Sequence, residues 1–150
     1  MKILMVCLGN ICRSPLAEGI MRTKIENSDL DWQVDSAGTY GGHAGELPDI
    51  RSMKVADENG IDLSKQRSRQ FRGYDLEEFD IIYAMDLSNK RDMLLQAQND
   101  DERAKIKLIM NELYPKENIE VPDPYYGDYG FENVYKMLDK ACDAIIEKYS

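Results

Sequence analysis

Metal-binding and disulfide-forming residues are scarce in this chain. Its 150 residues include one histidine and three cysteines, which are Cys7, Cys12 and Cys142. A structural zinc site needs a cluster of these residue types at short spacing, so such a site is excluded and we expect no metal. The cysteines are also too few and too unevenly placed for a disulfide framework. This shortage favours a cytoplasmic protein whose core needs neither metal nor disulfides.

Positive charge and long hydrophobic runs are scarce as well. The 19 Lys and Arg residues stand against 28 Asp and Glu residues, and the formal net charge is -9. This balance excludes a nucleic-acid-binding surface of broad positive charge. The apolar run at 1–8 is too brief for a secretory signal peptide, and no later run is long enough to span a membrane. We therefore expect no nucleic-acid partner and no membrane span, and any anion site has to be local.

The hydrophobic residues, 43% of the chain, follow a pattern of alternating strands and helices. Apolar runs typical of buried strands predict strands at 2–7, 32–36, 79–85 and, more weakly, 107–110. Apolar residues at helical spacing predict helices at 15–25, 48–59, 87–95 and 131–149. The alternation predicts an α/β fold with three α/β/α layers and a doubly wound, four-stranded parallel sheet. The length suits a single domain over residues 1–150.

Two local features refine this pattern. Ser14 and Pro15 predict the start of the first helix, with the serine as the cap and the proline at the first helical position. Cys142 falls on the apolar stripe of the last helix, so we interpret it as a packing residue.

The most informative segment is the loop between the first strand and its helix, residues 7–14, which reads CLGNICRS. It places Arg13 six residues after Cys7, with Gly9 and Ser14 at fixed positions between and beyond them. Chance predicts such a match only about 6 × 10⁻⁴ times in a chain of this composition. The segment therefore carries a specific signal.

The chemistry of this loop follows from its place before a helix. A short loop of this kind directs several backbone N–H groups at one point, where the helix dipole also favours negative charge. A phosphate and a thiolate are both stabilised there, so Cys7 is a candidate nucleophile. Arg13 can contact two phosphoryl oxygens through its planar guanidinium, and Gly9 lets the backbone approach closely. The alternative is that Cys7 is a small buried side chain and Arg13 caps a neighbouring carbonyl.

With these residues in place, the sequence resembles the low molecular weight protein tyrosine phosphatases, whose loop reads Cys-x-Gly-Asn-x-Cys-Arg-Ser near the N-terminus. The resemblance extends over nearly the whole chain, through Ser-Ala-Gly at 36–38, Met-Asp-x-Ser-Asn at 85–89 and Asp-Pro-Tyr-Tyr-Gly at 123–127. It implies a phosphatase whose substrates are phosphotyrosine proteins or small aryl phosphates and whose product is inorganic phosphate.

The resemblance also implies a role for each site residue. Cys7 attacks phosphorus while Asp123 protonates the leaving oxygen, and Asp123 then activates the water that hydrolyses the phosphocysteine. No metal or other cofactor takes part, because Arg13 and the loop amides meet the developing charge. The residues implied to bind substrate or phosphate are Leu8, Gly9, Asn10, Ile11, Cys12, Ser14, Tyr125 and Tyr126. Supporting roles fall to Ser36 and Asp86.

From the residues alone, several of these roles have a local alternative. Asp123 before a proline is also an ordinary turn signal, and Ser36 and Asp86 can serve as local caps. Cys12 is spaced to form a reversible disulfide with Cys7, or it is a buried bystander. Solvent-facing loop residues are the alternative for Tyr125 and Tyr126.

The chain departs from many family members at two places. Gln66 stands where a histidine usually precedes an Ala-Arg-Gln segment, and Gly42 aligns near an aromatic residue of the loop after the second strand, with Tyr40 and His43 close by. A basic group follows Gln66 in an otherwise acidic chain, and it is either a solvated patch or a steering surface for acidic phosphopeptides. Its members are Lys65, Arg67, Arg69 and Arg72.

Three other functions remain open. Protein arginine phosphatases resemble the chain but usually have threonine at the position of Ile11. Thioredoxin-coupled arsenate reductases share the fold and loop but need a further cysteine pair, which Cys142 does not provide. A phosphate or phosphopeptide sensor without turnover would keep the loop, although the presence of Cys7, Arg13 and Asp123 argues against it.

Overall fold

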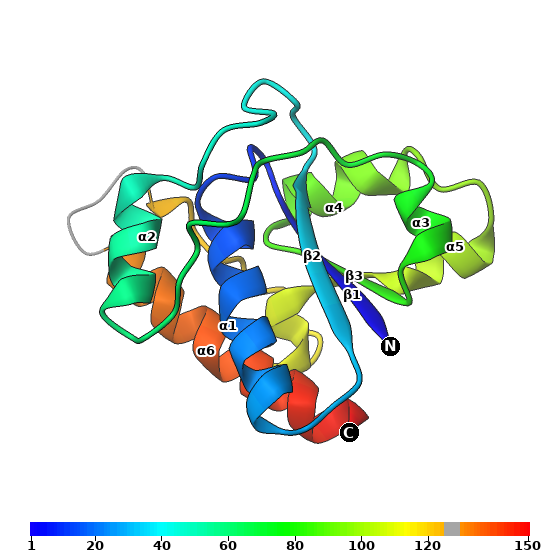
Figure 1. Cartoon of the computed structure of the whole chain (residues 1–150). Helices are drawn as coiled ribbons and strands as arrows, with labels where there is room; N and C mark the ends of the chain where they lie inside the picture. Colours follow the sequence, from blue (N-terminus) through cyan, green and yellow to red (C-terminus); the bar gives the residue numbers. More distant parts are fainter. Residues whose placement is uncertain (125–129) are drawn as a thin grey trace.

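A parallel sheet flanked by helices on both faces forms the body of the protein, as Figure 1 shows for the computed structural model, which describes residues 1–124 and 130–150. The strands are β1 (Lys2–Cys7), β2 (Gln33–Gly38), β3 (Ile81–Ala84) and β4 (Ile106–Leu108). They pair in parallel in the order β2-β1-β3-β4. The predicted α/β class with four parallel strands is therefore confirmed.

Helices cover the two faces in separate groups. The helices are α1 (Arg13–Asn27), α2 (Ile50–Asp57), α3 (Asp75–Glu78), α4 (Leu87–Leu94), α5 (Asp100–Lys105) and α6 (Gly130–Tyr149), with the 3-10 helix η1 (Ile109–Glu112) after β4. One hydrophobic cluster joins β1 to α1, α2 and α6 through Ile3 and Met5. The other cluster joins β1 to α3 and α4 through Leu4 and Val6. Because β1 is buried on both faces, its sequence shows no polar alternation.

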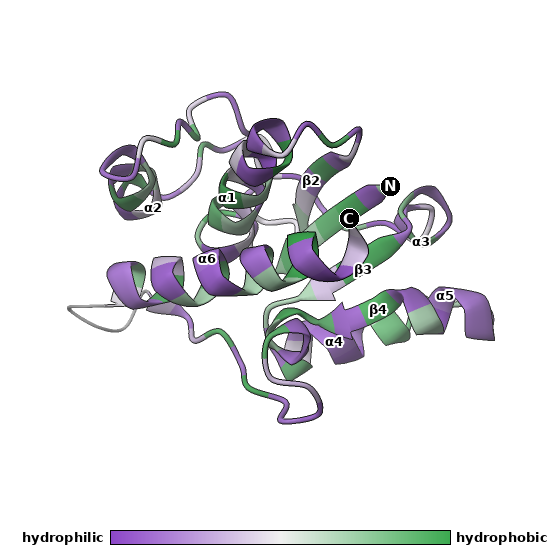
Figure 2. Cartoon of the chain, turned by 90° about the horizontal axis from the view of Figure 1, so that it is seen from below, coloured by the Kyte–Doolittle hydropathy of each residue, from purple (hydrophilic) through white to green (hydrophobic). Residues whose placement is uncertain are grey.

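The helices expose polar sides to solvent, and Figure 2 shows β1 and β3 coloured largely as hydrophobic between them. Cys142 is fully buried on α6 in the first hydrophobic cluster, which confirms its interpretation as a packing residue. Within the part of the chain described, no helix combines the length and hydropathy that a membrane crossing requires.

The element boundaries correct the prediction at several points. Helix α1 begins at Arg13, so Pro15 is its third residue, where a missing backbone N–H is still tolerated. The cap position is Cys12 and not Ser14, because the Ser14 hydroxyl contacts Asn10 and Cys7 instead. Strand β2 runs to Gly38, beyond its predicted end, and β4 stops before the 3-10 helix. Helices α3 and α5 were not predicted, because 4 and 6 residues are too few to show a helical period.

The sheet order places one crevice at the carboxyl ends of its central strands. The chain leaves β1 toward α1 on one face and β3 toward α4 on the other. Open parallel sheets bind ligands where neighbouring strands send their connections to opposite faces. The loop of residues 7–13 follows β1 at this point (Figure 1).

Candidate active site

A pocket of about 430 Å³ opens beside the 7–13 loop. Its walls are Cys7, Leu8, Gly9, Ile11, Cys12, Arg13, Tyr40, His43 and Asp123. These residues come from three separate segments, which are the 7–13 loop, the loop after β2 and the segment after Val121. The structure thus gathers the predicted nucleophile, the arginine and the predicted proton donor around one cavity.

The Cys7 sulfur lies at the base of this loop with two polar neighbours. Its Sγ is 3.0 Å from the Ser14 Oγ, and the Asn10 backbone N–H donates to it at 3.3 Å. The Ser14 Oγ accepts a hydrogen bond from the Asn10 side-chain amide at 2.8 Å, so its own proton is available to donate. The sulfur is its nearer acceptor, since the Ala37 carbonyl oxygen is 3.4 Å away. This arrangement suits a sulfur that carries negative charge.

Asn10 holds the loop in a conformation that few residues adopt. Its φ is 56°, in the left-handed region where asparagine is tolerated better than most side chains. Its buried side chain makes three hydrogen bonds: the amide nitrogen donates to Ser14 Oγ and, at 2.9 Å, to Ser36 Oγ, and Oδ1 accepts from the Arg69 backbone N–H at 3.0 Å. These bonds come from three parts of the chain and fix both the backbone and the amide.

Strand β2 packs directly against the loop backbone. A side chain at Gly38 would place its Cβ 2.7 Å from the Leu8 carbonyl oxygen and 2.9 Å from the Asn10 nitrogen. These are backbone atoms that cannot move aside, so only glycine fits at the end of this strand. The requirement explains the glycine of the Ser-Ala-Gly motif at 36–38.

Arg13 is buried in the pocket wall and is oriented by two acceptors. Its Nη1 donates to Asp86 Oδ2 at 2.7 Å and to the Val121 carbonyl oxygen at 3.0 Å. Burial alone would lower the pKa of Arg13, but the charges of Cys7, Asp86 and Asp123 outweigh it and raise the pKa above the ordinary arginine value. Both bonds use Nη1, and within the described residues no partner engages Nη2, which leaves donors for a phosphoryl group.

The other predicted residues divide between the pocket and its support. Leu8, Gly9, Ile11 and Cys12 line the cavity. The side chains of Asn10 and Ser14 lie buried behind the loop, outside the lining, and hold the loop by bonding to each other beside the Cys7 sulfur.

The two predicted supporting residues, Ser36 and Asp86, bond to residues of the 7–13 loop. Ser36 accepts from Asn10, while Asp86 both pairs with Arg13 and caps α4 by accepting from the Asn89 backbone N–H at 2.8 Å. Tyr125 and Tyr126 lie outside the described residues. Among the residues described, no group of three or more His, Cys, Asp and Glu is placed to hold a metal ion.

The sequence did not predict three further contributors. Tyr40 and His43 line the pocket. From the sequence, Tyr40 was noted only as a neighbour of Gly42, and His43 was interpreted as a solvated loop residue with a substrate contact as the alternative. Glu18 is buried in α1 and accepts a 2.6 Å hydrogen bond from Ser36 Oγ, and burial raises its pKa, opposed by Ser36 and Arg22. The only sequence signal for Glu18 is its place four residues after Ser14, on the same side of the helix.

The three cysteines are expected to differ in reactivity toward iodoacetate. Burial and the nearby Asp49 raise the pKa of Cys12 to about 12, and burial also raises the pKa of Cys142. Both thiols stay protonated at neutral pH because their pKa values lie far above neutrality. Since only the thiolate is nucleophilic, both should react slowly. We expect peptide mass spectrometry to find the label on Cys7, with phosphate slowing the reaction. Labelling of Cys12 at a comparable rate would contradict this assignment.

Comparisons with known proteins agree with the geometry. The family model described as low molecular weight phosphotyrosine protein phosphatase matches residues 2–149. The low molecular weight phosphotyrosine protein phosphatase of Homo sapiens is 39% identical over 150 residues, covering 97% of this chain and 94% of the human one.

Solved structures are similar over the same extent. The crystal structure of a protein tyrosine phosphatase from Entamoeba histolytica, with Hepes in its active site, matches with a TM-score of 0.92 at 40% identity and covers 99% of this chain and 96% of its own. The crystal structure of a drosophila arginine phosphatase matches with a TM-score of 0.92 at 32% identity and covers 100% of this chain and 98% of its own.

Proposed function

The chain belongs to the family of low molecular weight phosphotyrosine protein phosphatases, and on that premise we propose that it hydrolyses phosphotyrosine and other aryl phosphate monoesters through a phosphocysteine intermediate on Cys7. The observation that carries the proposal is the Cys7 sulfur, which is bonded by the Asn10 N–H and faces the Ser14 hydroxyl in a loop that ends at Arg13. Phosphotyrosine proteins are the proposed substrates and inorganic phosphate is the product.

In the first step the Cys7 sulfur attacks phosphorus in line with the leaving oxygen. The new S–P bond forms as the P–O bond to the aryl group breaks, and the electron pair leaves with the phenolic oxygen. Because a tyrosine phenol has a pKa near ~10, the phenolate is a poor leaving group and benefits from a proton donor. Asp123 stands in the pocket wall to supply that proton.

In the second step water attacks phosphorus and the S–P bond breaks. The Asp123 carboxylate, now deprotonated, takes the proton from water, and the sulfur leaves as the thiolate. Ser14 and Asn10 face this sulfur and stabilise its charge. Arg13 donates to the phosphoryl oxygens in both steps, and its pairing with Asp86 holds the guanidinium in place.

The proposal is tested by hydrolysis of p-nitrophenyl phosphate combined with rapid acid quenching. We expect steady turnover and, in quenched samples, a phosphate group on the peptide that contains Cys7. A sensor without catalysis would bind phosphate but show neither turnover nor phosphocysteine. Phosphate found on another residue would also contradict the proposed intermediate.

Arginine phosphatase activity is the second candidate, because a drosophila arginine phosphatase is among the similar structures. Ile11 lines the pocket, and its apolar side chain favours an aromatic ring over a charged guanidinium group. Parallel assays with phosphotyrosine and phosphoarginine peptides decide between them. A higher kcat/KM for the phosphoarginine peptide would replace the proposed substrate class.

Asp123→Asn is expected to affect substrates according to their leaving groups. The asparagine cannot donate a proton, so we expect kcat for phenyl phosphate to fall by about 10²- to 10⁴-fold. The loss should be smaller for p-nitrophenyl phosphate, because its phenolate leaves more readily without protonation. Equal losses for the two substrates would indicate that Asp123 does not act as the proton donor.

Two broader features belong to the same proposal. Residues 1–150 act as one domain, since both hydrophobic clusters include β1 of the single sheet. The protein works in the cytoplasm, where its three free cysteines stay reduced.

A further inference from the structure

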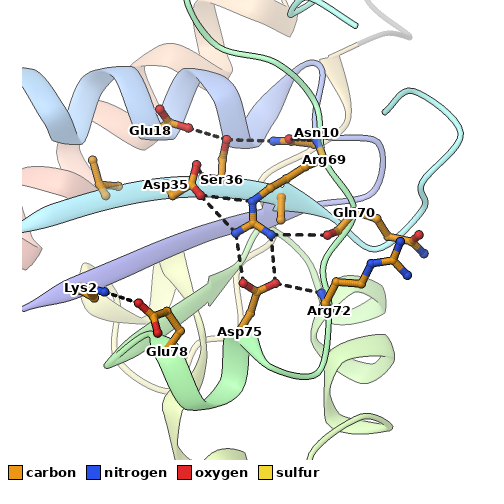
Figure 3. Close-up of polar contacts among 12 residues, drawn as sticks. Lys2, Asn10, Glu18, Asp35, Ser36, Arg69, Gln70, Arg72, Asp75 and Glu78 are labelled. Atoms are coloured by element: carbon orange, nitrogen blue, oxygen red, sulfur yellow. Dashed lines mark hydrogen bonds and ion pairs between the residues drawn. The ribbon is translucent and has the colours of Figure 1, made fainter. Parts of the chain in front are cut away.

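One arginine outside the pocket is held by two carboxylates and also contacts the loop that carries the nucleophile. Arg69 lies on the segment between α2 and α3, and Figure 3 shows its guanidinium between the side chains of Asp35 and Asp75. We propose that Arg69 is a positioning residue for the Cys7 nucleophile, because its clamped side chain fixes the backbone N–H that holds Asn10. The proposal rests on the proposed function and adds a residue that touches neither the sulfur nor the pocket.

The side chain of Arg69 is fixed from two directions. Asp75 accepts two hydrogen bonds from the guanidinium, at 3.1 Å from Nη1 and 3.2 Å from Nη2. Asp35 of β2 accepts from Nε at 3.2 Å. Asp75 is 1% exposed and also accepts from the Arg72 backbone N–H at 2.9 Å, so it is itself immobile. This planar, two-pronged pairing orients the guanidinium in a way that a lysine ammonium could not.

The backbone of Arg69 connects this clamp to the loop. Its N–H donates to Asn10 Oδ1 at 3.0 Å, and its carbonyl oxygen accepts from the Gly38 N–H at 2.9 Å. The preceding residue adds a third bond, since Ser68 Oγ donates to the Gly9 carbonyl oxygen at 3.0 Å. The segment therefore lies against β2 and the loop at once, and the guanidinium clamp sets its position.

A second connection runs through Asp35. Its Oδ1 accepts from the Ser36 backbone N–H at 2.8 Å, and the Ser36 hydroxyl accepts from the Asn10 amide. Two of the three residues bonded to the Asn10 side chain, Arg69 and Ser36, therefore also bond to the same aspartate. Because the Asn10 N–H donates to Cys7 Sγ, loosening this group changes the hydrogen bonding of the sulfur itself.

The alternative role for Arg69 is purely structural, as an ion pair that attaches α3 to the sheet. The chain offers a matched control for that role. Lys24 of α1 is likewise held by two carboxylates, Asp139 at 2.8 Å and Asp143 at 2.7 Å on α6, and it has no contact with the loop. Lys24→Met thus removes another basic side chain that pairs with two carboxylates, both of them more exposed than Asp75.

The test compares Arg69→Met, Arg69→Lys and Lys24→Met in two measurements. We expect kcat/KM for p-nitrophenyl phosphate to fall about 10- to 100-fold in Arg69→Met and less in Arg69→Lys, since small displacements of reacting groups have effects of this size. We also expect the pH of half-maximal Cys7 alkylation by iodoacetate to rise in Arg69→Met. Lys24→Met should lower the midpoint of thermal unfolding and leave both quantities unchanged.

A folded Arg69→Met with the alkylation profile and kcat/KM of wild type would overturn the proposal, as would equal effects from Lys24→Met. If Arg69→Met does not fold, Asp35→Asn replaces it in the test, since it neutralises only the partly exposed carboxylate bonded to Arg69. The same fall in kcat/KM and rise in the pH of half-maximal alkylation are then expected of Asp35→Asn. The alkylation measurement needs no turnover, so it separates this proposal from the proposed function. A wild-type protein that fails to hydrolyse aryl phosphates would contradict the function and leave the Arg69 comparison decidable.

Discussion

Cys7→Ser is expected to reduce turnover of p-nitrophenyl phosphate by on the order of 10⁵-fold or more, a loss typical of removing the nucleophile in covalent catalysis. A serine hydroxyl is protonated at neutral pH and needs a base to become a nucleophile. The two groups that face this position, the Ser14 hydroxyl and the Asn10 N–H, cannot act as that base. The measurement is the initial rate of nitrophenol release at saturating substrate.

The same variant should still bind phosphate, because the loop amides and Arg13 remain. Isothermal titration with inorganic phosphate is expected to give an affinity within about tenfold of wild type, since the anion loses no partner. Cys142→Ser is the control, because this fully buried residue of α6 is not part of the pocket lining and its substitution should change neither turnover nor phosphate affinity. Substantial turnover in Cys7→Ser would contradict the phosphocysteine mechanism directly.

Arg13→Lys is expected to lower kcat/KM for aryl phosphates by about 10³-fold. A lysine keeps the positive charge but lacks the planar set of donors that meets two phosphoryl oxygens while also bonding to Asp86 and the Val121 carbonyl. Loss of one oriented donor in a comparable anion site lowers the rate by about 10²- to 10³-fold, and the lysine loses more than one. Steady-state kinetics with p-nitrophenyl phosphate measure the change.

The control is Arg103→Lys, which alters an exposed ion pair with Asp100 on α5. It should leave kcat/KM unchanged, because surface pairs of this kind contribute little. Circular dichroism is needed to show that Arg13→Lys is folded, since the variant alters a buried ion pair with Asp86. A folded Arg13→Lys with near wild-type kcat/KM would show that charge alone, without the guanidinium geometry, supports the reaction.

The parts of this protein that could be predicted from sequence are those encoded locally. Strand β1 has the predicted bounds, because its apolar run ends at the glycine and asparagine of the next loop. The 7–13 loop was predicted for the same reason, since Cys7 and Arg13 are brought together by a single turn between a strand and its helix. Each of these inferences needs only neighbouring residues.

The parts that could not be predicted depend on residues far apart in the chain. Arg69 lies in a basic group that the sequence presents as a solvated or steering patch, yet its side chain pairs with Asp35 and the buried Asp75. Glu18 faces Ser36, which is 18 residues away. Hydrophobic period and motif spacing carry no information on such partners, because the contacts exist only after the sheet has formed.

The left-handed backbone of Asn10 has a consequence for how the protein handles phosphate. Since three of the protein's own groups bond to the side-chain amide of this residue, the loop proposed to bind the anion is preorganised and needs little rearrangement when a ligand arrives. The loop then cannot distinguish an arriving monoester from the free anion by an induced change of shape. If the proposed mechanism holds, we therefore expect inorganic phosphate to compete with the next substrate for this preformed loop.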